Sequence, residues 1–208
     1  ASGDELVRLR LGFDRMQGKI QDHIHELEAT VKTRTEELQE KNRELSEIAI
    51  RDALTTLYNR RGLIQKFCEE YKRAQRNREN LAVVILDIDD FKALNDHYGH
   101  SVGDEVICGV ASVISIRGED LHARWGGEEF IILLPDTEFT GGSAVAEKMR
   151  RYISEKEFNY EGQMIKITVT LGLVRMEGDE ALNDSVKRAD GALYQGKEQG
   201  RDQVIVLS

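Results

Sequence analysis

The first segment that could do chemistry is acidic, and it lies at residues 87–90. It reads Asp-Ile-Asp-Asp and directly follows the apolar run 81–86. Carboxylates at the end of a buried strand are costly without a counter-charge, so a cation is expected beside them.

The second segment is the pair Glu128-Glu129, which follows Gly126-Gly127. Two glycines allow the positive φ angles of a two-residue turn and leave the backbone open to a close ligand. The segment therefore predicts the tip of a hairpin, with the two glutamates projecting to opposite sides of the next strand.

Either acidic segment alone is more simply a solvated loop. Taken together with the glycines and the apolar flanks, they favour a site of oxygen ligands. Such a site suits Mg²⁺ that is bound partly through the phosphates of a substrate.

The elements that must position these carboxylates belong to a mixed α/β domain. After residue 51, short apolar runs alternate with amphipathic stretches, as such domains require. Strands are expected at 81–86, 165–174 and 204–207, helices at 102–116, 143–153 and 181–198, and a hairpin from 121–125 and 130–134.

The first 51 residues have a different pattern, which is typical of a coiled-coil stalk. Residues 4–51 contain no proline, and their apolar residues recur in steps of three and four, so a parallel dimer is expected. Two successive steps of four, from Met16 through Ile20 to Ile24, would locally unwind the supercoil. A passive stalk and a signalling stalk whose twist can change both remain open. The predicted boundaries are 1–51 for the stalk and 52–208 for the domain.

Composition excludes several classes of protein. The formal charge of −9 argues against a general nucleic-acid binder, and an acidic protein that handles phosphates needs a metal ion or a few well-placed cations. The longest apolar run is too short to cross a bilayer. Cys68 and Cys108 form no CxxC pair, which favours a reduced, cytoplasmic setting.

Four blocks of the chain resemble the GGDEF family, the diguanylate cyclases. They are 52–60 (Asp-Ala-Leu-Thr-Thr-Leu-Tyr-Asn-Arg), 87–104, the hairpin 126–130 (Gly-Gly-Glu-Glu-Phe) and 189–201. The blocks occur in order and cover about residues 50–208. In addition, residues 4–20 resemble the second helix of HAMP domains, which implies the cytosolic end of a receptor anchored in a bacterial inner membrane.

The resemblance implies a palm-like α/β (α+β) domain with a central, mostly antiparallel sheet flanked by helices. It also implies that two GTP molecules are joined into cyclic di-GMP with release of two pyrophosphates. Two Mg²⁺ ions, with Mn²⁺ as an alternative, would be held by Asp87, the Ile88 carbonyl, Glu128 and Glu129. Asp87, Glu128 and Glu129 would be catalytic, and Glu128 would assist deprotonation of the attacking hydroxyl.

The same resemblance implies residues that bind GTP. The contacts to the β- and γ-phosphates would come from Lys92, Lys197 and Arg201. The guanine would be read by Asn95 and Asp104. The remaining GTP-binding positions are His100, Gly126 and Gly127.

An RxxD motif, Arg117 to Asp120, ends five residues before the glycine pair and matches the product-inhibition site of the family. The helix position of its usual arginine partner holds Lys148, with Arg150 and Arg151 close by. Cyclic di-GMP is therefore the expected inhibitor as well as the product.

One domain has one nucleotide site, whereas the product needs two facing GTP molecules. The stalk would supply this pairing as a homodimer, and its twist would regulate the enzyme. Two alternatives are an inactive GGDEF domain that acts as a GTP or cyclic di-GMP receptor, and a coiled-coil scaffold with an inert domain.

Overall fold

The structure is a computed structural model that describes residues 16, 21, 25, 27, 30–41, 49–178 and 180–207. It divides into two units, Ala1–Ala49 and Ile50–Ser208, which are described separately. In the part of the chain that is described, no helix combines the length and the apolar character needed to cross a bilayer.

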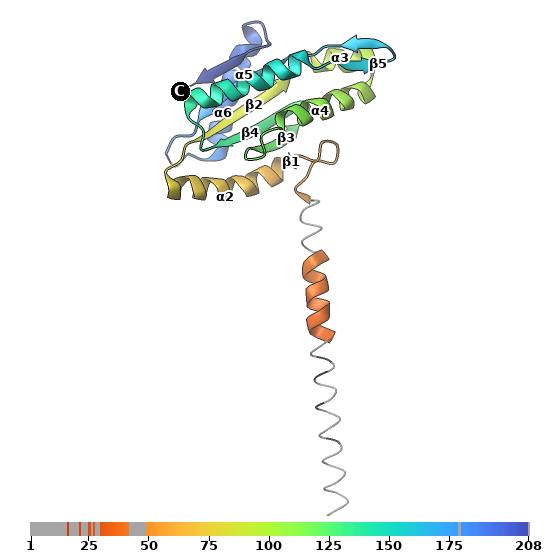
Figure 1. The fold of residues 1–208 in the computed structure, drawn as a ribbon, viewed down its shortest axis with the longest axis vertical. Coiled ribbons are helices and arrows are strands. Elements are labelled where there is room, and N and C mark those ends of the chain that lie inside the picture. The colour runs from red at the N-terminus through yellow and green to blue at the C-terminus, as the bar shows by residue number, and fades with distance from the viewer. Residues whose placement is uncertain are drawn as a thin grey trace, which may run out of the picture. The chain divides into compact units, whose positions relative to one another are not determined.

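In the first unit, residues 30–41 form a continuous helix, shown in orange in Figure 1. Three of the predicted seam residues, Leu27, Val31 and Leu38, are more than 60% exposed in the single chain. The step of four between Ile20 and Ile24, and most of the HAMP-like segment, lie outside the described residues.

The second unit is built around one six-stranded sheet (Figure 1). Its strands are β1 (Tyr58–Asn59), β2 (Leu81–Ile88), β3 (Leu121–Gly126), β4 (Glu129–Pro135), β7 (Val169–Arg175) and β8 (Val204–Leu207), and a separate hairpin is formed by β5 (Phe158–Tyr160) and β6 (Gln163–Ile165). The helices are α2 (Arg60–Asn77), α3 (Phe91–Tyr98), α4 (His100–Ile114), α5 (Phe139–Glu155) and α6 (Leu182–Glu198).

The order of the strands is β1-β3-β4-β2-β7-β8. β2 lies near the middle because all of its residues are buried, and it pairs antiparallel with both β4 and β7. The β3–β4 pair is also antiparallel, whereas β1–β3 and β7–β8 are parallel. The expected mixed α/β architecture with a mostly antiparallel sheet is confirmed.

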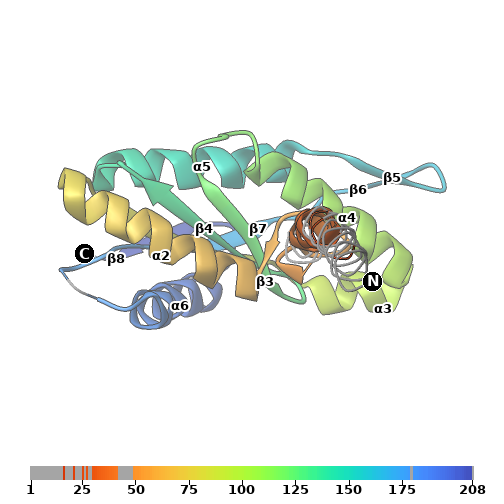
Figure 2. The same ribbon diagram turned by 90° about the horizontal axis from the view of Figure 1, so that it is seen from below.

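Helices cover both faces of the sheet (Figure 2). Alternate side chains of β2 point to opposite faces, so Val84 and Leu86 pack with α4 and α5, while Val83 and Ile85 pack with α2 and α6. One hydrophobic core therefore packs on each face of β2. These two cores fix the position of the last residues of β2 at the edge of the domain.

The prediction that one strand spans residues 165–174 is wrong at the N-terminal boundary of that strand. Ile165 ends β6 instead, and β7 begins at Val169. Glu161 and Gly162 both have positive φ and reverse the chain, so the preceding residues pair as the β5–β6 hairpin.

Candidate active site

Asp87 and Glu129 lie opposite each other on two adjacent strands. In the register of the sheet, Asp87 of β2 lies opposite Glu129 of β4 on one side and Thr170 of β7 on the other. Opposed residues of antiparallel strands project to the same face, here the face that α6 covers. Ile88 follows as the last residue of β2. The structure thus brings together the two carboxylates that the sequence placed in separate segments.

The electrostatics of this pair are unfavourable without a cation. Burial raises the pKa of Asp87, although Lys197, whose Nζ lies 2.9 Å from Asp87 Oδ1, opposes the shift. Burial and then the charge of Asp87 raise the pKa of Glu129. The charge of Glu128 acts in the same direction on both groups. A further positive charge would therefore be stabilised here.

The donor set fits a hard divalent cation. The side chains of Asp87, Glu128 and Glu129 offer only oxygen, and the Ile88 carbonyl directly follows Asp87 in the chain. Among the described residues, no three His, Cys, Asp or Glu side chains form a complete metal cage. An incomplete oxygen set at the mouth of a site is the arrangement with which Mg²⁺ keeps water and phosphate ligands.

The hairpin differs from its prediction in register. β3 continues to Gly126, which pairs with Glu129, so the turn consists of Gly127 and Glu128. Only Gly127 of the two glycines has a positive φ, of 53°. The expectation that Glu128 and Glu129 project to opposite sides of a strand is wrong, because Glu128 lies in the turn itself. An extra residue in β3, Trp125, causes the shift.

The opening block of the domain supports this turn. Arg124 Nε donates to the Gly127 carbonyl over 2.9 Å, and Arg124 Nη1 lies 3.3 Å from Asp52 Oδ1. Asp52 also accepts hydrogen bonds from the amide and the hydroxyl of Thr55. The sequence reasoning assigned no role to Arg124 or Asp52, although Asp52 begins the first of the four blocks.

Three cationic residues lie around the acidic end of β2. Lys197 of α6 contacts Asp87, and Arg201 Nε lies 3.4 Å from Asp90 Oδ1. Lys92 is exposed in the first turn of α3. Asp90, the residue before α3, makes no side-chain cap, which leaves amides at that helix end for an anion.

The two residues expected to read guanine lie near the place where α3 packs against α4. Asn95 of α3 lies so close to Gly103 that any Cβ at Gly103 would overlap its side-chain oxygen. That oxygen is buried and has no hydrogen-bond partner among the described residues. Asp104 follows Gly103 and is exposed, and His100, the first residue of α4, is also exposed. A buried acceptor without a partner beside an exposed carboxylate is suited to a polar ligand.

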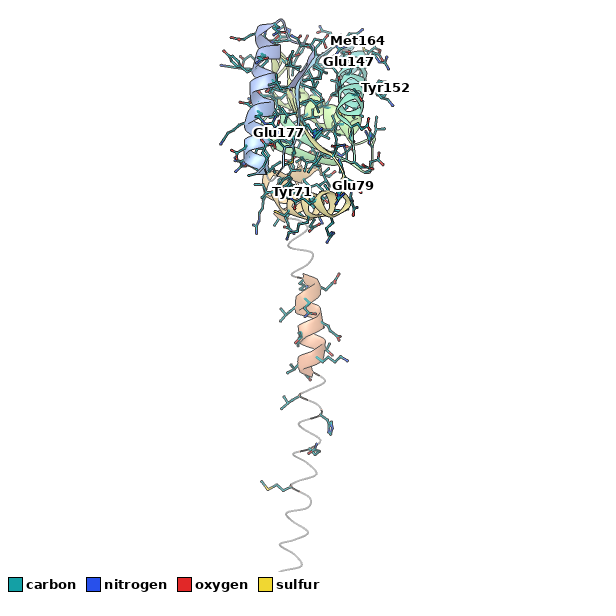
Figure 3. The ribbon with its side chains drawn as sticks, turned by 90° about the vertical axis from the view of Figure 1, so that its left-hand side faces the viewer. Tyr71, Glu79, Glu147, Tyr152, Met164 and Glu177 are labelled. Atoms are coloured by element: carbon teal, nitrogen blue, oxygen red, sulfur yellow. The ribbon has the colours of Figure 1, made fainter. Side chains whose placement is uncertain are left out.

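The expected product site is bordered by a cavity. Arg117 Nε lies 3.4 Å from Asp120 Oδ2, and Arg117 also binds Glu119. Arg117 and Lys148 line a mostly apolar cavity of about 200 Å³ between α4 and α5, together with Val145 and Tyr152. Tyr152 is labelled on α5 in Figure 3.

Asp120 and His122 are two buried ionisable groups near the start of β3. Burial raises the pKa of Asp120 to about 6, although Arg117 opposes this. Burial and then the charge of Arg117 lower the pKa of His122 to about 4. Within the described part of the chain, the two side-chain oxygens of Asp120 and the Nε2 atom of His122 have no hydrogen-bond partner. The fold therefore favours the uncharged form of both side chains.

Replacement of Asp120 by Asn is expected to make the fold sensitive to acid. The pKa of Asp120 is raised by folding, so its protonation stabilises the fold as the pH falls from about 6 towards 3.8. The pKa of His122 is lowered, so protonation of the unfolded chain destabilises the fold from 6.5 towards about 4. In the natural chain the two effects largely cancel.

With Asp120→Asn, His122 acts unopposed, and the free energy of unfolding should fall by about 3 kcal/mol more than in the natural chain between pH 6.5 and 4. Urea unfolding at several pH values measures this difference. His122→Asn should shift the dependence in the opposite direction. Parallel pH profiles for all three proteins would contradict the assignment.

Asp89 is a buried residue to which the sequence reasoning gave no separate role. It is 8% exposed, and its carboxylate accepts hydrogen bonds from Thr168, Thr170 and the amide of Asp202. No local pattern could have shown this, because all three donors are far away in the sequence. Arg150, expected near the product site, binds Asp202 and Glu147 instead.

Comparisons with known proteins agree with this geometry. The family model of the diguanylate cyclase GGDEF domain matches residues 49–203. Diguanylate cyclase DgcP of Pseudomonas aeruginosa is 34% identical over 212 residues, which cover 99% of this chain but only 31% of that protein. The chain thus spans about a third of the length of this relative.

Two solved structures are similar in fold. The coiled coil and GGDEF domain of DgcB from Caulobacter crescentus, in complex with c-di-GMP, superposes with a TM-score of 0.79 at 30% identity, covering 86% of this chain and 96% of that one. The active GGEEF domain of a diguanylate cyclase from Vibrio cholerae gives 0.67 at 34% identity, covering 72% and 97%. The expected palm-like fold is confirmed, and the chain belongs to the GGDEF family, the diguanylate cyclases.

Proposed function

We propose that residues 52–208 condense two GTP molecules into cyclic di-GMP and release two pyrophosphates. The observation that carries this proposal is the pairing of Asp87 with Glu129 beside an intact glycine turn. The five residues 126–130 read Gly-Gly-Glu-Glu-Phe, the same motif that names the active GGEEF domain of the Vibrio cholerae relative. Degenerate sites would be expected to lack one of these parts.

The metal in this proposal is Mg²⁺, two ions per site, with Mn²⁺ as an alternative. The proposed ligands are Asp87, the Ile88 carbonyl, Glu128 and Glu129. When bound, the metal would supply a Lewis acid at the α-phosphate and neutralise developing charge. The raised pKa values of Asp87 and Glu129 support this, since both carboxylates gain from an added cation.

The residues of the chain have separate tasks in the reaction. Lys92, Lys197 and Arg201 bind the β- and γ-phosphates, for which Lys197 exchanges its contact with Asp87 for one with phosphate. The half-buried Glu128, which lies in the turn, accepts the proton of the attacking 3′-hydroxyl on its carboxylate.

Recognition of guanine is assigned to the α3–α4 contact. Asp104 accepts from the guanine N1–H and amino group, while Asn95 supplies a further polar contact. Adenine presents no such pair of donors, so it would leave a carboxylate without partners. His100, Gly126 and Gly127 complete the GTP site.

The stalk, residues 1–51, is proposed to pair two chains as a homodimer and to regulate them. The exposed seam at Leu27, Val31 and Leu38 supports a partner helix, because apolar side chains in a regular row on a charged helix are stabilised by burial. The Caulobacter relative is described as a coiled coil with its GGDEF domain. We also propose a cytoplasmic location for this segment and a membrane-bound receptor as its parent.

Feedback by the product is proposed at Arg117 and Asp120. The guanidinium of Arg117 can bind a phosphate or a guanine edge, and Asp120 can accept from guanine. The neighbouring cavity would receive part of the ligand.

Chromatography of nucleotides after incubation with GTP and Mg²⁺ tests the proposed function. Cyclic di-GMP and pyrophosphate should appear in a 1:2 ratio, with a specific rate that rises with protein concentration until the dimer is complete. Added cyclic di-GMP should lower the initial rate. Binding of GTP without any product at high protein concentration would contradict the proposed enzymatic activity and favour the function of a receptor.

A further inference from the structure

The turn between α6 and β8 carries Arg201 in an unusual backbone conformation. Gly200, Arg201 and Asp202 have φ angles of 120°, 65° and 46°. Successive left-handed residues other than glycine are rare, and they persist where neighbouring groups hold them. The amide of Arg201 donates to the Gly196 carbonyl over 3.0 Å, which ties the turn to the end of α6.

Asp89 holds the main chain of this turn. Its Oδ2 accepts from the Asp202 amide over 3.1 Å. The carboxylate is fixed in turn by the hydroxyls of Thr168 and Thr170, each at 2.7 Å. A buried carboxylate with three donors has little freedom to rotate, so the Asp202 amide is bound to a fixed group directly after β2.

Arg150 of α5 holds the side chain of the same residue. Its Nη1 donates to Asp202 Oδ1, while Nε and Nη2 bind Glu147 at 2.7 to 3.1 Å. Figure 3 labels Glu147 on α5. The Arg150 side chain is only 18% exposed, which is low for a surface helix. Its guanidinium is thus oriented by Glu147 before it meets Asp202.

We propose that Asp89 and Arg150 are positioning residues for the phosphate contact made by Arg201. Asp89 binds the main chain of Asp202, and Arg150 binds its side chain. These contacts keep Arg201 beside Asp90 at the acidic end of β2, where Arg201 Nε lies 3.4 Å from Asp90 Oδ1. This inference rests on the proposed function, because it needs nucleotide phosphates at that end of the strand. It assigns to α5 a role in binding the triphosphate.

The test is nucleotide binding by the full chain, measured by calorimetry in the presence of Mg²⁺. The probe is 3′-deoxy-GTP, which lacks the attacking hydroxyl and cannot react, and GMP serves as the probe without β- and γ-phosphates. Arg150→Gln should weaken the binding of 3′-deoxy-GTP about five- to tenfold and change the affinity for GMP by less than about twofold. Arg150→Lys, which can still reach Asp202 with one donor, should recover part of the loss.

Arg151→Gln is the matched control, because Arg151 is the next residue of α5. Among the residues that the structure describes, its one carboxylate within ion-pair range is Glu155, at 3.9 Å. This variant should bind both nucleotides as the natural chain does. Asp89→Asn should also weaken the binding of 3′-deoxy-GTP while leaving the binding of GMP nearly unchanged. If it does not fold, Thr168→Val takes its place, since that change removes one of the three donors and leaves the other two.

A double variant separates positioning from general damage. If Arg150 acts through Arg201, then Arg150→Gln combined with Arg201→Gln should bind 3′-deoxy-GTP no more weakly than Arg201→Gln alone. Additive losses, or equal losses for GMP, would overturn the inference. Unchanged binding by Arg150→Gln while the natural chain binds tightly would also overturn it. No binding by the natural chain would instead remove the proposed function, and this inference with it.

Discussion

Asp87→Asn and Glu129→Gln should each lower the rate of cyclic di-GMP formation on the order of 10³-fold or more. In the proposed function, a metal at this site would contribute several kcal/mol of charge stabilisation to the transition state, and each change would remove one of its anionic ligands. The measurement is the initial rate of product formation at saturating GTP and Mg²⁺. Titration of the divalent ion should show a weaker apparent affinity in both variants.

The fold should tolerate both changes. Burial raises the pKa of each carboxylate, and the charges of neighbouring carboxylates add to the shift. The two charged groups therefore oppose folding, and a neutral amide relieves that cost. The midpoint of thermal unfolding should therefore stay the same or rise. Asp136→Asn, in an exposed residue just beyond the other end of β4, is the control and should keep full activity. Product at the natural rate from a site variant would remove the replaced residue from the proposed metal site.

Much of this site could be predicted because it depends on local patterns. A strand as apolar as 81–86 can only be central, and the carboxylates that follow it must lie at the edge of the core. The glycine pair marks a reversal of the chain within a few residues. What the pattern does not contain is the pairing of Asp87 with Glu129, because the choice of neighbour and register is made by the whole sheet.

The error in the hairpin has the same origin. A turn at Gly126-Gly127 and a turn at Gly127-Glu128 satisfy the local preferences equally, since both use glycine at a position with positive φ. The extra residue at Trp125 decides between them. Arg60 lies over the Trp125 ring at 4.4 Å, so a contact with α2 accompanies the irregularity that places Glu128 in the turn.

The supports of Arg201 could not be found from the sequence. Asp89 meets Thr168, 79 residues later, and Arg150 meets Asp202, 52 residues later. Proximity in the sequence pointed instead to Arg150 as a neighbour of Lys148 in the product site. Side chains three or four positions apart share a helix face, whereas Lys148 and Arg150 are two apart and diverge.

Gly172→Ala is expected to destabilise the catalytic unit by about 3 kcal/mol, a large effect for one methyl group. Helix α6 packs its backbone directly on Gly172 of β7. An added Cβ would lie 2.6 Å from the Leu193 amide nitrogen and closer still to the Ala189 carbonyl oxygen. Backbone atoms of a packed helix cannot rotate away as a side chain can, so α6 must move as a whole.

This movement has a consequence for the chemistry as well as for stability. Lys197 lies four residues beyond Leu193 on the same helix, and its contact with Asp87 depends on where α6 lies on the sheet. Gly172→Ala should therefore lower the unfolding midpoint by roughly 6 to 12 °C and also raise the KM for GTP at temperatures where the variant is still folded. Calorimetry and initial rates at 20 °C or so measure the two effects separately.

Gly191→Ala is the matched control in the same helix. Apart from its chain neighbours and the backbone of its own helix, no atom of the described residues lies within 4 Å of a Cβ at Gly191. The substitution therefore changes only the helix propensity and should stabilise the unit by about 0.5 to 1 kcal/mol. Opposite signs for the same chemical change would show that the distance between α6 and β7, and not the glycine content of the helix, sets the stability and the place of Lys197. Equal and small effects at both positions would show that α6 is not held at this distance.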